Sequence, residues 1–222
     1  MRSWTSRLQV LVFAVSMVAL ASPARADFIT GYGWVTTEPL SQSATAASLA
    51  DPTCHMGTAA CTHANADVTF TTTGINFQAF SAVSISAWLA TSAFPLNGLV
   101  DSVPGSPMDP TIWEFVGNAS FTSPQNFTFA HDDGLTFVVN GQTVVNAPGP
   151  TGPAITNGTY TGGAGGSLPF DLIYSECCGG PAVLTTDLVG PNNPPVPEPG
   201  SLLLFGLGLA GFAGYVRARR RA

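Results

Sequence analysis

Hydrophobic and polar residues alternate over short runs along the middle of the chain. The clearest run is Leu135–Val139, followed by Asn140-Gly141 and a second run over 142–145. Asn-Gly between two runs rich in β-branched residues is the strongest short-range signal of a β-hairpin, because both turn residues must accept a positive φ. The pattern therefore predicts a hairpin over 135–145.

Six further segments show the period of two that is typical of half-buried strands. They are Val68/Phe70, Ile75/Phe77, Val83/Ile85/Ala87/Leu89, Trp113/Phe115, Phe127/Phe129 and Leu168/Phe170/Leu172/Tyr174. Helical periodicity is confined to a short helix around 43–49, and the segment 147–166, rich in Gly, Pro and Thr, is expected to be a long surface loop. We therefore predict an all-β fold, a single antiparallel β-sandwich.

The N-terminal segment has the pattern of a secretory signal peptide. Arg2 and Arg7 precede an apolar stretch over 8–21, and Ala24-Arg25-Ala26 fits a small-residue cleavage site. An uncleaved anchor is the alternative, but the apolar stretch is shorter than a bilayer requires. We expect a signal helix within 1–26, an exported domain over 27–189 and a Pro/Asn-rich linker over 190–195.

The last segment, 196–222, is organised in three parts. Its first six residues are Val196, Pro197, Glu198, Pro199, Gly200 and Ser201. The two prolines prevent a helix from running through them, so the apolar helix is expected over 202–216. These 15 residues fall short of the roughly 20 that cross a bilayer, and arginines 217, 219, 220 and 221 follow, which the positive-inside bias places in the cytoplasm.

This order of parts resembles the PEP-CTERM sorting tail. The resemblance implies export across the inner membrane, a membrane-anchored intermediate held through 202–216, and processing by an exosortase-type enzyme. It also implies a final location at the cell surface or in the extracellular matrix.

Charge is divided sharply between these terminal signals and the domain. All seven basic residues lie in the two terminal segments, and residues 27–196 carry 12 acidic residues and no Lys or Arg. The exported part therefore has a net charge of about −12 with neutral histidines. Binding to nucleic acid is excluded, because phosphate contacts require cationic side chains. Each carboxylate must meet water, hydrogen-bond donors or an external cation.

Two motifs in the second half of the domain carry the candidate chemistry. A strand that ends in Asp132-Asp133-Gly134 leads into the Asn-Gly hairpin, and Tyr174-Ser175-Glu176 is followed by glycines and Ala182-Val183-Leu184. This order resembles the protective-antigen/flocculin-type β-sandwich over roughly 113–188. That family occurs in adhesins, glycosidases and toxins and often binds carbohydrate.

The resemblance implies a calcium ion held by Asp132 and Asp133 that grips sugar hydroxyls. The chain departs from the family pattern in a longer spacing between Glu176 and Ala182, and a second calcium loop is not identified. Asp-Asp-Gly is also an ordinary turn, in which Asp side chains bind nearby amides. Asn140, Asn146 and carbonyls of the 147–166 segment are the candidates for further ligands.

Four cysteines in an exported chain indicate disulfides. Cys54 and Cys61 flank a short loop, so we favour a Cys54–Cys61 bridge together with a bridge between the adjacent Cys177 and Cys178, although longer-range pairings remain open. A zinc site made by Cys54, His55, Cys61 and His63 is the alternative. His131, next to Asp132, is a candidate base or a strand-end histidine.

Signatures of the common enzyme classes are absent from the sequence, including G-x-S-x-G, H-E-x-x-H, the P-loop and the dinucleotide fingerprint. We therefore expect a non-enzymatic surface or matrix protein that binds extracellular polysaccharide. The alternatives are a purely structural matrix protein and a glycan-active enzyme. Glu176 would serve the latter, but it has no partner carboxylate at a deducible distance.

Overall fold

The computed structural model describes residues 28–163 and 165–189. The predicted signal peptide, the linker over 190–195 and the sorting tail lie outside the described residues. Within the described part of the chain, the helices are all too short to span a bilayer.

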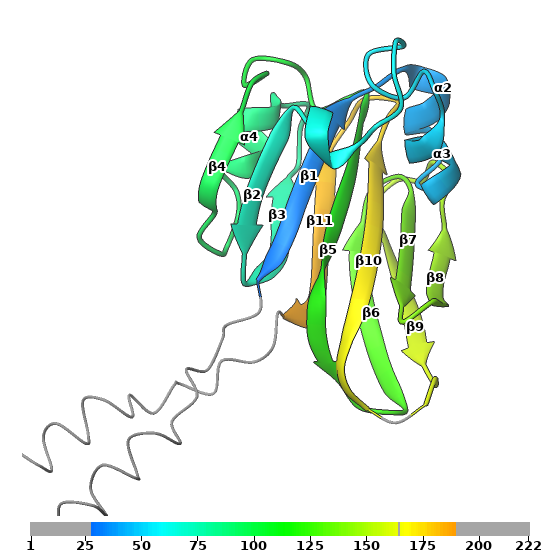
Figure 1. Ribbon diagram of the computed structural model, residues 1–222. Helices are drawn as coiled ribbons and strands as arrows, with labels where there is room; N and C mark the ends of the chain where they lie inside the picture. Colours follow the sequence, from blue (N-terminus) through cyan, green and yellow to red (C-terminus); the bar gives the residue numbers. More distant parts are fainter. Residues whose placement is uncertain (1–27, 164, 190–222) are drawn as a thin grey trace, which may run out of the picture. The chain divides into compact units, whose positions relative to one another are not determined.

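The described residues form a sandwich of two antiparallel sheets (Figure 1). The larger sheet has the order β4 (Asn97–Asp101), β2 (Val68–Thr72), β1 (Ile29–Val35), β5 (Thr111–Phe121), β10 (Gly166–Glu176), β7 (Leu135–Val139) and β8 (Gln142–Ala147). The smaller sheet has the order β3 (Gly74–Ala79), β11 (Ala182–Val189), β6 (Gln125–His131) and β9 (Ala154–Tyr160). The predicted all-β antiparallel sandwich is confirmed.

The core lies between the two sheets and is rich in aromatic rings. Phe137 of β7 packs against Phe127 and Phe129 of β6, with ring centroids 5.2 and 5.1 Å apart. Trp88 stacks on Phe77 at 4.4 Å and contacts Trp113. Apart from Trp88, these inward residues lie in segments that the alternating pattern predicts as strands, because side chains of a strand point to opposite faces in turn.

The hairpin predicted over 135–145 is confirmed as β7 and β8. Asn140 and Gly141 have φ values of 47° and 78°, which is the turn geometry that the Asn-Gly pair indicates. Phe170 of β10 pairs with Val139 across the sheet, so the hairpin extends the seven-stranded sheet at one edge.

The strand predicted around 83–89 is wrong, because this segment contains the helix α4 (Ile85–Leu89). Ser84 caps the helix by accepting a hydrogen bond from the Ala87 amide at 3.3 Å. Buried Ile85, Trp88 and Leu89 follow the i, i+3, i+4 spacing of a helix face. Apolar residues also occupy the alternate positions 83, 85, 87 and 89, so the sequence pattern resembles that of a strand and not the helical spacing.

The loop predicted over 147–166 is also partly wrong, because β9 lies within it and pairs with β6 along its whole length. Its outward positions are Ile155, Asn157 and Thr159, and its inward positions include Gly158 and Tyr160. An edge strand with so few large apolar residues gives a weak periodic signal.

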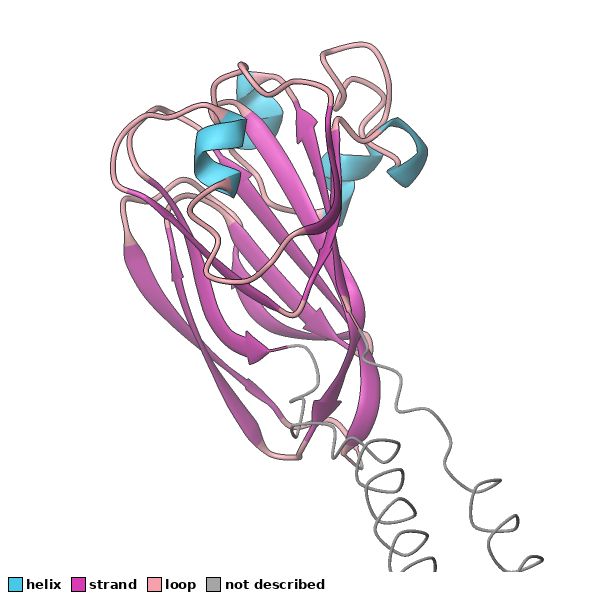
Figure 2. Ribbon diagram, turned by 90° about the vertical axis from the view of Figure 1, so that its left-hand side faces the viewer, coloured by secondary structure: helices cyan, strands magenta, loops and turns pink. Residues whose placement is uncertain are grey.

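The short helices gather at one end of the sandwich (Figure 2). They are α2 (Glu38–Ser41), α3 (Ala46–Ala50), the 3₁₀ turn η1 (His63–Asn65) and α4. The helix α3 confirms the short helix expected around 43–49. At the same end, Trp34, Leu49 and the buried cysteines Cys54 and Cys61 form a second small core.

Candidate cation-binding site

The Asp-Asp-Gly motif forms the connection between β6 and β7. The Asp132 amide donates to the Val183 carbonyl of β11 at 3.0 Å. Asp133 has a φ of 54°, a left-handed conformation that Asp tolerates better than most residues. A Cβ on Gly134 would lie 2.3 Å from the Pro148 carbonyl oxygen, so only glycine fits there. Turn chemistry thus accounts for part of the motif.

The fold brings a third carboxylate to this turn. Glu176 is the last residue of β10, and Asp132, Asp133 and Glu176 each offer a carboxylate oxygen within 4.8 Å of the others. Their side chains belong to residues that are only 4%, 4% and 1% exposed. We call these three residues the acidic cluster. In the sequence Glu176 stands alone as a strand carboxylate, because its partners lie more than forty positions earlier.

Neighbouring hydrogen bonds hold two members of the acidic cluster in place. Asp133 accepts from the Thr151 amide at 3.2 Å through Oδ1 and from the Cys177 amide at 2.8 Å through Oδ2. Tyr174 donates its hydroxyl to Glu176 Oε2. Each of these oxygens keeps a second lone pair, so the contacts orient the carboxylates without consuming their capacity as ligands.

A fourth carboxylate, Asp109, lies beside the acidic cluster. Its Oδ2 accepts from the Gly179 amide at 2.7 Å, whereas its Oδ1 is buried without a hydrogen-bond partner among the described residues. Asp109, Glu176, Gly179 and Gly180 line a pocket of about 120 Å³. Glu176 of the cluster and Asp109 therefore line the same pocket, and one oxygen of Asp109 has no donor among the described residues.

Burial and mutual repulsion shift the acid–base behaviour of the cluster. Burial, followed by the charge of Asp133, raises the pKa of Asp132 from 3.8 to about 6. Burial raises the pKa of Glu176 from 4.5 to about 9, against the opposing effect of the Tyr174 hydrogen bond. Burial also raises the pKa of Asp133, although the Cys177 and Thr151 amides oppose this. At neutral pH, full ionisation of the cluster requires an added positive charge.

The donor set fits a hard cation such as calcium. Calcium takes six to eight oxygen ligands and favours carboxylates, and the three carboxylates with Asp109 supply oxygens only. Residues 28–189 contain no Lys or Arg that would neutralise them instead. Of the other predicted ligands, Asn140 lies at the opposite end of β7 from Asp133, and Asn146 pairs with Thr136 within the β7–β8 hairpin.

His131 is held by the turn and does not face open solvent. It is 1% exposed, its Nδ1 lies 2.8 Å from the Asp133 carbonyl oxygen, and its Nε2 lies 2.8 Å from Thr156 Oγ1. Burial lowers the pKa of His131, with the Asp133 carbonyl acting in the opposite direction. Its contacts support a structural histidine at the end of β6.

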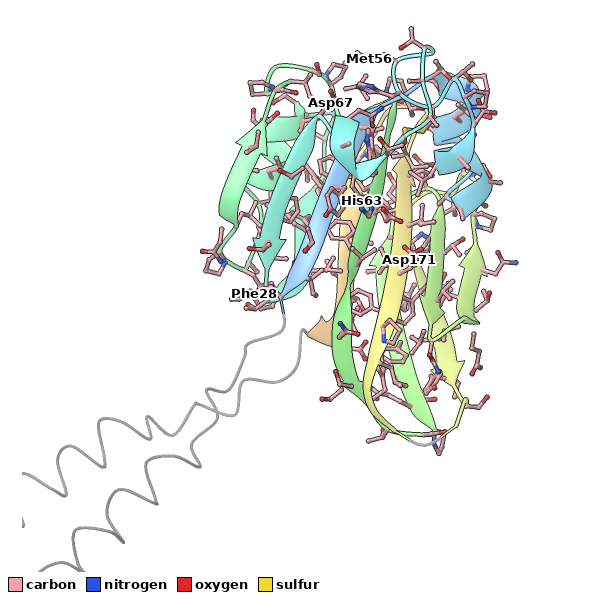
Figure 3. The ribbon with its side chains drawn as sticks, in the orientation of Figure 1. Phe28, Met56, His63, Asp67 and Asp171 are labelled. Carbon is pink, nitrogen blue, oxygen red and sulfur yellow. A yellow bond between two sulfur atoms is a disulfide. The ribbon has the colours of Figure 1, made fainter. Side chains whose placement is uncertain are left out.

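The cysteines pair in the two bridges Cys54–Cys61 and Cys177–Cys178. The zinc alternative is not formed, because the bridge leaves no thiolate at Cys54 or Cys61. Its histidines have other partners: His55 Nε2 lies 3.1 Å from Asp67 Oδ1, and His63 Nε2 lies 2.6 Å from Glu114 Oε2 (Figure 3 labels His63 and Asp67).

Two solved structures resemble the whole sandwich. One is titled "PA14 sugar-binding domain from RTX adhesin", with a TM-score of 0.52, 22% identity and coverage of 73% of this chain and 89% of that chain. The other is the PA14 domain of the MpAFP antifreeze protein, with a TM-score of 0.51, 17% identity and coverage of 78% and 88%. At these identities the likeness concerns the fold.

Sequence comparison identifies the tail. Residues 195–221 match the family model of the PEP-CTERM protein-sorting motif. No curated protein matches the sequence significantly. The motif implies export and handling by exosortase-type processing machinery. The chain thus joins a β-sandwich with the PA14 fold to a C-terminal PEP-CTERM protein-sorting motif.

Proposed function

We propose that this chain is an exported, non-enzymatic protein that binds polysaccharide at the cell surface or in the extracellular matrix, with a calcium ion at the acidic cluster. The sorting motif supports the route, since it implies delivery to the membrane and processing there. The adhesin domain described as sugar-binding shares the fold, and this likeness supports carbohydrate as the ligand class.

The acidic cluster is the observation that carries the proposal. Three buried carboxylates approach within 4.8 Å in a domain without Lys or Arg, an arrangement that costs free energy unless protons or a cation neutralise it. Asp132, Asp133 and Glu176 would hold the ion, and Asp109 borders it. A bound calcium ion offers coordination positions that sugar hydroxyls fill.

The geometry favours binding over glycoside hydrolysis. A glycosidase places its two carboxyl groups on either side of an accessible glycosidic bond. Here the three carboxylates instead converge on one point, with an oxygen of each within 4.8 Å of the others. A purely structural role is less well supported, because Glu176 and Asp109 line a pocket rather than a filled interior.

Calcium titration of the full-length, chelator-treated protein tests the proposal. Excess calcium is expected to raise the melting temperature of the wild type, because a ligand that binds only the folded state stabilises it. Asp132→Asn should lose this response, and Asp187→Asn, an exposed Asp→Asn change on β11, should keep it. Retention on exopolysaccharide should fall in chelator. A wild type with no thermal response to calcium and unaltered retention in chelator would contradict the proposal.

A further inference from the structure

A second pocket lies on the outer face of the four-stranded sheet, the sheet behind the seven-stranded one in Figure 1. Its volume is about 240 Å³. The residues that form it include Gln78, Phe80, Ala130, Ile155, Val183 and Thr185. We call this pocket the trough.

Two exposed apolar side chains bound the trough. Phe80 is 76% exposed and Ile155 is 71% exposed, the highest values among the exposed large hydrophobic residues of the described chain. Phe80 follows β3 and Ile155 lies on β9, and these are the two edge strands of the sheet. Isolated apolar residues on a surface need no explanation, but these two line the same pocket from opposite edges.

Small and polar residues lie between these two side chains. Ala130 pairs with Thr185 on one side and with Ile155 on the other, and Val183 pairs with Gln78. Three strand spacings of about 4.8 Å separate the edge strands, so the trough crosses roughly 14 Å of sheet. Gln78 donates through Nε2 to Asn76 Oδ1 at 3.0 Å, which orients its amide at the rim.

The described residues that line the trough include no Asp, Glu, Lys or Arg, although the domain is strongly acidic. His131 also lines it, but it is 1% exposed, and its ring nitrogens contact the Asp133 carbonyl and Thr156 Oγ1. Residues 27–196 carry 12 acidic residues and no Lys or Arg, so a polyanion would be repelled. Apolar walls, amide and hydroxyl groups and the lack of positive charge together match a neutral, hydroxyl-rich ligand with an apolar face.

We propose that the trough binds one or two sugar rings of a neutral polysaccharide. The apolar face of a ring packs on Phe80 and Ile155, and its hydroxyls meet Gln78 and Thr185. The volume of the trough, about 240 Å³, lies below the roughly 300 Å³ at which pockets for drug-sized ligands begin, which suits a short segment of one or two rings. The inference rests on the proposed function and deepens it by naming the class of glycan and a second contact surface. The trough is linked to the acidic cluster through β11, because the Asp132 amide donates to the Val183 carbonyl.

Binding of the full-length protein to immobilised neutral and uronic-acid-rich polysaccharides tests this proposal. Phe80→Ala should weaken binding to the neutral polymer at least tenfold and leave the calcium-induced thermal shift unchanged. Phe28→Ala is the matched control, because Phe28 is 45% exposed and precedes β1, away from the trough (Figure 3). It should bind like the wild type. Since Phe80 is mostly exposed, its removal should not unfold the sandwich.

The outcomes separate this proposal from the proposed function. Equal affinity of Phe80→Ala and wild type for the neutral polymer would show that the trough does not bind it. Loss of binding in Asp132→Asn would still support a calcium-dependent site at the acidic cluster. Calcium-independent binding that Phe80→Ala abolishes would support the trough alone. Preference for the acidic polymer would overturn the neutral-glycan assignment. A wild-type dimer that Phe80→Ala converts to monomer in sedimentation would assign the trough to a second copy of the chain.

Discussion

The hydroxyl of Tyr174 donates a hydrogen bond to Glu176, two residues further along the same face of β10. Tyr174 is 0% exposed and Glu176 is 1% exposed, so the pair lies in the interior where the last residue of the strand meets Asp132 and Asp133. Burial raises the pKa of both groups, and that of Glu176 reaches about 9. In the cation-free protein Glu176 therefore retains its proton at neutral pH.

Removal of this carboxyl should alter how stability depends on pH. In chelator, unfolded Glu176 loses its proton near its ordinary pKa of 4.5, whereas folded Glu176 keeps it up to a pKa of about 9. The free energy of unfolding of the wild type should therefore fall by a few kcal/mol as the pH rises through this window. Glu176→Gln should show a shallower fall, measured by urea denaturation at pH 5, 7 and 9. An equal slope in both proteins would refute the assignment, and Asp187→Asn should match the wild type.

Calcium affinity should rise with pH, because calcium and protons compete for the same oxygens. Between a pKa of about 6 for Asp132 and about 9 for Glu176, binding should release about one proton. The dissociation constant should then fall up to about tenfold per pH unit, and more steeply below pH 6, where both groups are protonated. Calorimetry in buffers of different ionisation enthalpy counts the protons directly. An affinity that is constant from pH 5 to pH 9 would show that calcium binds elsewhere.

The sequence predicts those parts of the fold that are encoded locally. Asn140-Gly141 specifies its own turn, and alternation over 168–174 identifies a strand because every second side chain faces the core. The helix α4 is not apparent from the sequence because two of its buried residues also fall on alternating positions. The strand β9 is equally hidden, because pairing with β6, rather than its own side chains, fixes it.

The candidate site is likewise predicted from the sequence only in its local part. Asp132 and Asp133 are adjacent, so sequence alone places them together at a strand end. Their proximity to Glu176 and Asp109 depends on the pairing of β10 with β5 and β7, which local patterning does not specify. Apart from the Asp132-Asp133 motif itself, the absence of Lys and Arg from residues 27–196 is the feature of the sequence that points to an external cation.

The two disulfides should have different roles. Cys54 and Cys61, separated by seven positions, close a loop, so replacing both with Ala should cost about 2–3 kcal/mol of stability. Cys177 and Cys178 are adjacent and close no loop, but the Cys177 amide holds Asp133 Oδ2. Replacing that pair with Ala should weaken calcium binding more than it lowers stability. Denaturation and calcium titration of both double variants give the comparison, and calcium binding weakened equally in both would argue against a positioning role for the Cys177 amide.

Asp171 lies on the outer face of the seven-stranded sheet (Figure 3). Its ionised carboxylate should destabilise the protein at neutral pH. Its Oδ1 is buried without a hydrogen-bond partner in the described part of the chain. Burial, followed by the charge of Glu114, raises the pKa of Asp171 from 3.8 to about 6, while His63 opposes this. His63 stacks on Tyr32 at 3.9 Å and bonds to Glu114, so its ring is already engaged by two other groups.

Asp171→Asn should therefore stabilise the protein above pH 6 and have less effect at pH 4. The folded wild type holds the Asp171 proton up to a pKa of about 6, whereas the unfolded chain releases it near 3.8, so wild-type stability is lost as the pH rises through this window. Asparagine does not titrate, and the variant should gain about 1–2 kcal/mol at pH 8, less than the full shift implies because solvent screens a partly exposed group. Urea denaturation at pH 4 and pH 8 measures the difference. A change of the same size at both values would mean that the substitution acts through packing or hydrogen bonding rather than through the charge.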